Sequence, residues 1–412
     1  MNLAVISVCA LALAVLVSCV SRLNVGVLAV ALAWIVGVYI GALPVNTVMA
    51  GFPSQLFLTL TGVTLLFALA QSNGTLERIT HHAVHICRGN RGVIPVMFFL
   101  LAAALSSMGP GNISTAALMA PLAMATATRS DIPLFLMAIM VGNGANAGAL
   151  SPFAPTGIIV DGLMARNGLP GLEWQTYLYN LAAHATLAFG GYALFGGLKL
   201  FGTGSVAVPE LEDGSDGVFK LRHWMTIGVI ATLILSVVLA QINVGMGAFV
   251  GAVILVLSKS ADDGEAIKRM PWRVIVMVCG VTVLIALVER AQGINLLVSL
   301  VAKVASAKTV TFIIALLTGL VSVYSSTSGV VLPAFLPMVP GLAAALPGAS
   351  ALAIASSMNI GGHVVDVSPL STIGALCLAG APPEETRDLF NKLLAWGLSM
   401  AIVGAALCYV IF

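Results

Sequence analysis

Apolar residues in this chain fall in long uninterrupted runs, not in the alternating patterns of half-buried helices or strands. Runs close to the roughly 20 residues that cross a bilayer are typical of transmembrane helices. Polar or turn-forming residues separate ten such runs, which we predict as membrane spans at 2–20, 25–41, 54–72, 132–165, 177–201, 224–240, 244–258, 271–289, 350–380 and 389–412. The pattern predicts an all-α polytopic membrane protein.

Two further apolar stretches, 93–128 and 309–346, are each interrupted midway by small and polar residues. The interruptions lie at 106–115 in the first stretch and at 322–329 in the second. Unwound backbone at membrane depth is tolerated only where it is buried in protein or lines a wet cavity. We therefore expect each stretch to form a re-entrant helical hairpin whose tip lies inside the membrane.

Composition narrows the class of protein further. Hydrophobic side chains make up 59% of the 412 residues and charged ones only 8%, about a third of the share in a soluble globular domain. An ordinary soluble enzyme is thereby excluded. The formal net charge of +2, without clustered Lys and Arg, does not indicate a nucleic-acid partner. The six cysteines have no CxxC spacing, so we expect no disulfide or zinc framework.

The distribution of basic residues predicts the topology. With the N-terminus outside, fourteen of the 18 Lys and Arg residues lie on the inner side and four on the outer side. Such an excess is what the positive-inside rule requires. We expect a multi-pass protein of the cell inner (plasma) membrane with both termini external and a cytoplasmic linker at 202–223, the longest polar stretch.

The two halves of the chain share residues at a nearly constant offset of 217 or 218. The matching pairs are Pro53 with Pro271, Gly62-Val63-Thr64 with Gly280-Val281-Thr282, Ser151-Pro152 with Ser368-Pro369, and Gly157 with Gly374. This indicates a duplication into halves 1–201 and 224–412. Each half has five spans, one of them broken, and one hairpin. Because five is odd, the two copies are predicted to be inverted repeats, as in many secondary transporters.

The broken spans carry glycine and proline at 142–152 and 359–369. We expect both segments to unwind, because glycine permits unusual backbone angles and proline removes a hydrogen-bond donor. Freed carbonyls would bind a hard cation, and freed N–H groups at helix N-termini would attract an anion. The alternative is that these residues only permit close helix packing.

Hydroxyl and amide groups at the four breaks are the candidate site residues, with His363 and Asp366. For the substrate we predict Asn112, Ser114, Thr115, Asn143, Ser326, Thr327, Ser328, His363 and Ser368. For sodium we predict Ser107, Asn112, Gly144, Asn146, Ser325, Asn359 and Asp366. None of the four breaks contains Lys or Arg, so a dianion would need co-bound cations, which is why we expect coupling to sodium.

Ionisable residues within membrane spans are functional candidates by default. His363 and Asp366 could share a helical face and carry a proton, or Asp366 could ligate sodium while His363 contacts the carboxylate. Alternatively, His363 is a neutral, hydrogen-bonded residue of a packed helix. We interpret His184 as a satisfied core residue. His81, His82 and His85 have metal-like spacing but lie in a basic segment, so we interpret them as a solvated surface.

The paired hairpins and broken helices resemble the divalent anion/sodium symporter family of the ion transporter superfamily. Met108-Gly109-Pro110-Gly111-Asn112 and Ser325-Ser326-Thr327-Ser328-Gly329 are most similar to its malonate-carrier-type dicarboxylate permeases. The resemblance covers the whole chain. It implies sodium-coupled uptake of a small dicarboxylate, malonate or a four-carbon acid, by an elevator motion, usually in a homodimer. It also implies Ser-Asn-Thr motifs at the hairpin tips; here the asparagine is displaced in one tip and absent from the other.

Other functions fit the sequence less well. An intramembrane hydrolase is not expected, because the chain lacks GxSxG and HExxH motifs. Antiparallel halves with paired hairpins suit alternating access better than a constant channel. The nearer alternatives are the membrane subunit of a binding-protein-dependent dicarboxylate transporter and a sodium/proton antiporter of the same superfamily. We expect no cofactor other than the coupling sodium ions.

Overall fold

The computed structural model describes residues 2–21, 23–79, 89–202, 205–206 and 219–412, and most of them are helical. The first half contains α1 (Leu3–Val20), α2 (Val25–Trp34) continued by the π-helix η1 (Ile35–Ile40), α3 (Val45–Met49), α4 (Ser54–Ser72), α6 (Val93–Ser107), α7 (Gly111–Arg129), α8 (Leu134–Ala147), α9 (Pro155–Arg166), α10 (Glu173–Leu194) and the short 3₁₀-helix η2 (Gly197–Gly202). Two short strands, β1 (Gly89–Asn90) and β2 (Ser205–Val206), pair antiparallel.

The second half repeats the same order of long elements. It contains α11 (Leu221–Ala240), α12 (Val244–Leu257), α13 (Asp263–Arg269), α14 (Trp272–Arg290), α15 (Gly293–Ala302), α16 (Val310–Ser322), the π-helix η3 (Thr327–Val331), α17 (Leu332–Phe335), the 3₁₀-helix η4 (Leu336–Met338), α18 (Val339–Ala345), α19 (Ala351–Val364), α20 (Thr372–Ala379) and α21 (Thr386–Ile411). The inverted orientation of the two halves in a bilayer stays a prediction.

Four described helical segments are long and apolar enough to cross a membrane by length and composition: α4, α14, the continuous segment from η3 to α18, and α21. Eight shorter helices are also apolar. Together they support a multi-pass membrane protein.

The structure differs from the predicted spans in two respects. It contains three helices that were not predicted, α3, α13 and α15, and its α11 begins at Leu221, inside the predicted linker. The rest of that linker from 207 to 218 lies outside the described residues, as do His81, His82 and His85.

The interruptions in both hairpin stretches lie where the sequence predicts them. Helix α6 ends at Ser107 and α7 begins at Gly111, while α16 ends at Ser322 and η3 begins at Thr327. In the first turn the backbone has a φ of 135° at Gly109 and 76° at Gly111. A Cβ at Gly109 would also lie 1.9 Å from the Phe67 ring. The tip therefore requires glycine for both its backbone angle and its packing.

The prediction that the broken spans unwind at their glycines is wrong for 142–147 and 359–364. These residues stay in α8 and α19, and the helices end only at Ala147 and Val364. A Cβ at Gly144 would lie 2.5 Å from the Phe99 carbonyl oxygen, and one at Gly361 would lie 2.3 Å from the Ala315 carbonyl oxygen. The glycines thus allow helix backbones to approach each other closely, which does not require unwinding.

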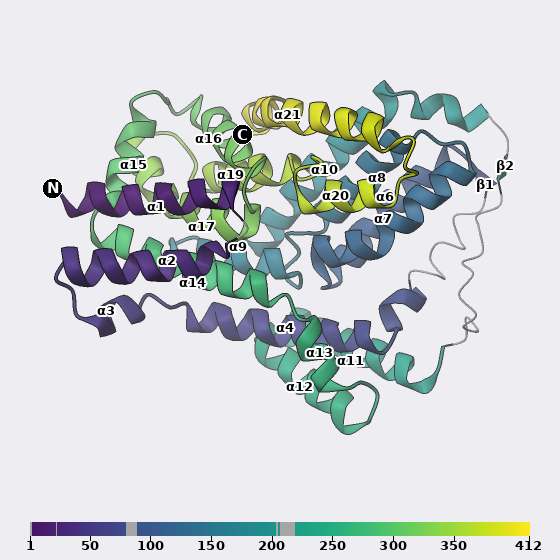
Figure 1. Cartoon of the computed structure of the whole chain (residues 1–412), viewed down its shortest axis with the longest axis horizontal. Helices are drawn as coiled ribbons and strands as arrows, with labels where there is room; N and C mark the ends of the chain where they lie inside the picture. The colour runs from purple at the N-terminus through teal and green to yellow at the C-terminus, as the bar shows by residue number, and fades with distance from the viewer. Residues whose placement is uncertain (1, 22, 80–88, 203–204, 207–218) are drawn as a thin grey trace.

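The helices divide into two groups by their packing. The frame group comprises α1 to α4 and α11 to α15; the core group comprises α6 to α10 and α16 to α21. In the frame group α2 packs against α14 and α4 against α12, so each pair combines both halves of the sequence. In Figure 1, α2, α4 and α14 lie along the lower side of the molecule and α10, α20 and α21 along the upper side.

Glycine lies at both of these frame crossings. A Cβ at Gly280 would lie 2.2 Å from the Gly26 carbonyl oxygen, and a Cβ at Gly62 would lie 2.4 Å from the Gly245 carbonyl oxygen. Gly62 and Gly280 are one of the pairs that the repeat relates. Only glycine allows the helix backbones to approach this closely, so the two crossings hold the halves of the chain together.

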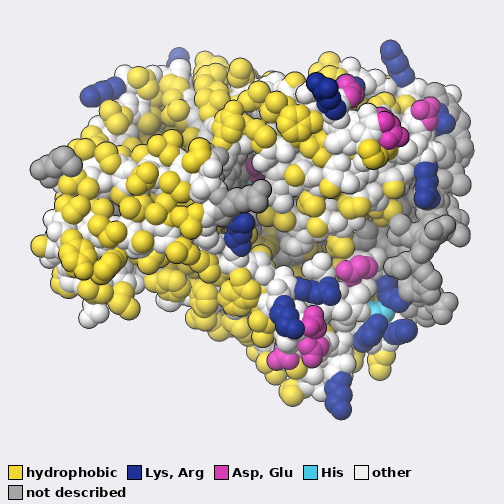
Figure 2. Space-filling model, in the orientation of Figure 1, with side chains coloured by type: hydrophobic (Ala, Val, Ile, Leu, Met, Phe, Trp, Pro, Cys, Tyr) yellow, Lys and Arg dark blue, Asp and Glu magenta, His cyan; other side chains and the backbone are white. Residues whose placement is uncertain are grey.

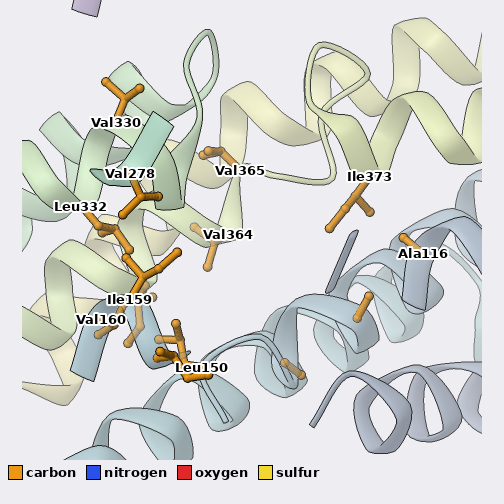
Figure 3. Packing of buried hydrophobic residues seen from close by; sticks show 14 of the residues in the cluster. Ala116, Leu150, Ile159, Val160, Val278, Val330, Leu332, Val364, Val365 and Ile373 are labelled. Carbon is orange, nitrogen blue, oxygen red and sulfur yellow. The ribbon is translucent and has the colours of Figure 1, made fainter. Parts of the chain in front are cut away.

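Small and branched side chains fill the space within the core group and between the core and frame groups. In Figure 3, Ile373 of α20 lies near Ala116 of α7, and Val278 of α14 lies near Val330 and Leu332 of the second hairpin. All five side chains are at most 2% exposed. These contacts hold α20 against α7 and the second hairpin against α14.

Charged side chains gather at one end of the molecule. On the face in Figure 2, hydrophobic side chains cover the end with α1, α2 and α3, whereas most charged ones lie over the other half of the molecule. A broad apolar surface beside a charged end is expected of a protein whose helices face lipid.

Candidate functional site

A cavity of about 460 Å³ lies at the boundary between the frame and core groups. The frame group lines it with residues from the end of α1, the start of α2 and the start of α14: Ser21, Leu23, Val25, Arg273, Val274 and Met277. The core group lines it with the two hairpin tips and the segment between α19 and α20. Its volume is in the range of roughly 300–1,000 Å³ typical of small-molecule sites.

Seven predicted site residues line this cavity. They are Asn112, Ser325, Ser326, Thr327, Ser328, His363 and Asp366. All but one come from the second half, so the described cavity is dominated by the second hairpin tip and the second broken span. The first half contributes Asn112 from its hairpin tip.

Thr327 links the second hairpin to the end of α19. Its hydroxyl donates to Asp366 Oδ1 at 2.8 Å, and it also contacts Ser322 Oγ. Because a hydroxyl has a single proton, Ser322 must then donate to Thr327. Ser371 Oγ donates to the Asp366 carbonyl oxygen, which holds the carboxylate segment from the other side. One hydroxyl group therefore holds the Asp366 carboxylate and a second one holds its backbone.

Asn112 lies in the first turn of α7, at the first hairpin tip, and is part of a chain of amides. Its Nδ2 donates to Asn146 Oδ1 at 2.9 Å, and Asn146 Nδ2 donates in turn to the His363 carbonyl oxygen at 3.4 Å. Asn180 Nδ2 donates to the Asn146 backbone oxygen at 2.8 Å. This chain of amides connects the first tip with the ends of both α8 and α19.

His363 lines the cavity but does not pair with Asp366 among the described hydrogen bonds. Its Nδ1 contacts the Asn359 carbonyl oxygen at 2.8 Å, and its Nε2 has no hydrogen-bond partner among the described residues. The side chain is only 1% exposed. A buried ring nitrogen without a partner is costly, so a ligand group in the cavity would be a favourable partner for Nε2.

The other predicted residues lie away from the cavity. Ser114 lines a separate recess of about 40 Å³, and Thr115 is fully buried. Ser107 is one of the predicted sodium ligands. Its carbonyl oxygen already accepts a hydrogen bond from Ser151 Oγ at 2.7 Å. Gly144 and Asn359 are buried. Ser368 Oγ accepts a hydrogen bond from the Leu370 amide. The role of these three residues as ligands stays a prediction.

Asn143 lies in the interior and contacts His184. Its Oδ1 is 2.9 Å from His184 Nδ1, and both residues are fully buried. His184 is thus a core residue, as the sequence indicates. However, its Nε2 has no partner among the described residues, so it is not fully satisfied. A histidine on an apolar span gives no sequence signal that its partner is a predicted site residue.

Arg273 is the main cavity residue that the sequence does not predict. It lies in the first turn of α14, outside all four breaks, yet it lines the cavity opposite the hairpin tips. Asn24 Nδ2 donates to its backbone oxygen at 3.0 Å. The four breaks contain no Lys or Arg, but the cavity that they help to line includes this arginine of α14. The signal that was missed is the position of Arg273 at the start of a span.

The described lining of the cavity includes clustered hydroxyls, the Asp366 carboxylate and the Arg273 guanidinium, besides the Asn112 amide and the His363 ring. Hydroxyls and a guanidinium donate hydrogen bonds to an anion, whereas the Asp366 carboxylate accepts them or binds a cation. The arrangement can hold a small acid and a cation together.

The fold and the apolar helices define a multi-pass helical membrane protein. The structure is similar to that of the Alcanivorax borkumensis YdaH transporter, with a TM-score of 0.60 over 88% of this chain and 87% of that one, at 16% sequence identity. At this identity the likeness shows the fold alone.

The sequence comparison is more specific for the first third of the chain. Residues 1–149 match the family model described as Dicarboxylate carrier protein MatC N-terminus. No curated protein sequence matches the chain. The predicted resemblance to malonate-carrier-type dicarboxylate permeases is confirmed, and both matches are to transport proteins rather than enzymes.

Proposed function

We propose that this chain is a secondary active transporter that imports a small dicarboxylate, malonate or a four-carbon acid, together with sodium. The observation that carries the proposal is the cavity, where tip hydroxyls, Asp366 and Arg273 face one volume of about 460 Å³. The match of residues 1–149 to a dicarboxylate carrier family supports a dicarboxylate as the transported acid.

Charge balance supports the coupling to a cation. A dicarboxylate brings two negative charges into a cavity that already holds the Asp366 carboxylate, and a buried charge without a partner is costly. Arg273 offsets only one of these charges. Co-bound sodium would offset the others, with oxygen ligands from Asp366, Ser325 and Asn112, which all line the cavity.

The position of the cavity supports an elevator motion. Its walls come from two groups of helices, so movement of the core group against the frame group would carry a bound substrate across the membrane. Ser21 and Arg273 lie at span ends that the topology places on the cytoplasmic side, so the described conformation would be open inward. An inner-membrane location with external termini and a homodimeric assembly belong to the same proposal.

Reconstitution tests the function directly. Purified protein in liposomes should take up labelled malonate or succinate when sodium is higher outside than inside, and uptake should collapse when potassium replaces sodium. The Asp366→Asn variant keeps the size of the side chain and removes its charge, so sodium stimulation should be lost. Empty liposomes give the background.

Two outcomes would replace the proposal with another function. Proton flux that a pH-sensitive dye reports under a sodium gradient, without any organic substrate, would indicate a sodium/proton antiporter. Uptake that requires an added binding protein would indicate a subunit of a larger transporter.

A further inference from the structure

We propose that Arg273 binds the second carboxylate of the substrate and thereby makes the cavity selective for dicarboxylates over monocarboxylates. The inference rests on the proposed function and names a specificity-determining residue for it. Arg273 belongs to the frame group, whereas the tip hydroxyls belong to the core group, so the substrate would bridge the two groups in this conformation and leave Arg273 when the core group moves.

The backbone of Arg273 is held in a fixed position. Asn24 donates from Nδ2 to the Arg273 carbonyl oxygen, and the same side chain accepts from the Gly26 amide at 2.9 Å as the N-cap of α2. Gly26 in turn lies against α14, where a Cβ would be 2.2 Å from the Val276 carbonyl oxygen. The side chain of Arg273 therefore projects from a rigid pair of helices.

The second hairpin tip faces the same side of α14. A Cβ at Gly329 would lie 2.0 Å from Met277 Cε, so the tip packs on Met277. Arg273 precedes Met277 by four residues, and residues at this spacing lie on one face of a helix. Ser326 and Thr327 at the tip and Arg273 on α14 all line the same cavity. An acid that places one carboxylate at the tip hydroxyls has its other carboxylate in the cavity with Arg273.

Helix stability does not explain this arginine. A cation in the first turn of a helix is disfavoured by the helix dipole. The repeat offset of 218 places the neutral Gln55 at the equivalent position of α4. A guanidinium, by contrast, offers several donors in a planar fork that matches a carboxylate. Of the two equivalent residues, Arg273 lines the cavity and Gln55 does not.

Binding measurements with matched ligands test the inference. Purified wild type, Arg273→Gln and Arg273→Lys are compared for binding of succinate and of succinamate, which has the same length but a single carboxylate. We expect Arg273→Gln to weaken succinate binding at least about tenfold and to leave succinamate binding nearly unchanged. Arg273→Lys should retain part of the preference, because it keeps the charge and loses the fork. Arg387→Gln is the control, since Arg387 is exposed in the first turn of α21 and does not line the cavity.

Each other outcome is decisive. Equal losses for both ligands in Arg273→Gln would indicate a structural role, and no loss for either would indicate an anchor at the membrane surface; both overturn the inference. These results leave the proposed function intact if wild type binds succinate in a sodium-dependent manner. A wild-type protein that binds neither ligand nor malonate overturns the proposed function and this inference with it.

Discussion

Asn112 and Asn146 form a buried amide pair in which Asn112 Nδ2 donates to Asn146 Oδ1 at 2.9 Å. The pair joins the first hairpin tip to the end of α8. Asn146 extends the connection by donating to the His363 carbonyl oxygen in the second half. A substitution of either asparagine therefore removes a contact in the network that connects the first hairpin tip, the end of α8 and the end of α19.

Removing this pair should reduce stability cooperatively. Asn146→Ala leaves Asn112 Nδ2 without its acceptor, which costs about 1–3 kcal/mol for a buried polar group. Asn112→Ala should have a similar effect, and the double variant should lose less than the sum of the two. Unfolding of the detergent-solubilised protein measures all three free energies. Asn167→Ala is the control, because the Asn167 side chain donates only to Leu163 of the preceding helix among the described contacts. If the losses of the two single variants add up to the loss of the double variant, the pair is not coupled.

Thr327 should be required for tight binding. Thr327→Val keeps the shape of the side chain and removes the hydroxyl that donates to Asp366. Hydrogen bonds to charged groups contribute about 1.5–3 kcal/mol, so we expect a loss of substrate or sodium affinity of about ten- to a hundredfold. Thr327→Ser keeps the donor and should bind within a few-fold of wild type. Binding isotherms at several sodium concentrations measure both affinities; a valine variant that binds like wild type would contradict the role of the hydroxyl.

His363→Ala should reduce uptake. The ring faces the cavity with Nε2 unpartnered among the described residues, so its removal deletes one group that can contact the substrate. For a neutral hydrogen bond we expect a loss of about five- to tenfold in the ratio of maximal rate to half-saturating concentration. Initial uptake rates in liposomes measure this ratio. Wild-type rates and affinity in the variant would remove His363 from the site.

Gly280→Ala should destabilise the frame group. The added Cβ would lie 2.2 Å from the Gly26 carbonyl oxygen, so α2 and α14 would have to separate. Overpacking of this kind costs about 1–3 kcal/mol. Gly228→Ala is the matched control in α11, where a Cβ meets no atom within 4 Å. Melting curves of the two variants should differ clearly; equal curves would show that this crossing is adaptable.

The sequence predicts the hairpin tips well, for a physical reason. Glycine, proline and hydroxyl residues at 106–115 and 322–329 cannot continue an apolar helix without a break, and the structure has its helix ends there. The glycines at 142–148 misled the prediction, because composition does not distinguish a glycine that unwinds a helix from one that lets another helix approach. Gly144 is of the second kind.

Arg273 could not be predicted as a cavity residue from local pattern. At the start of a span it has the same signature as any basic residue at the membrane surface. Its place in the cavity depends on the crossing of α2 and α14 and on the contact between Met277 and Gly329, which are tertiary features. His184 illustrates the same point, because its partner Asn143 lies on a different helix.

The exchange of helices in the frame group has a consequence for biosynthesis. Since α2 is covered by α14 and α4 by α12, the amino-terminal portion leaves the ribosome with its glycine-containing surfaces still uncovered. The helices of the amino-terminal half lack their native neighbours until the carboxy-terminal half is inserted into the membrane, and the reverse is also true. Two separately expressed polypeptides, divided within the polar stretch after residue 202, should therefore be degraded when produced singly and accumulate when produced together in the same cell.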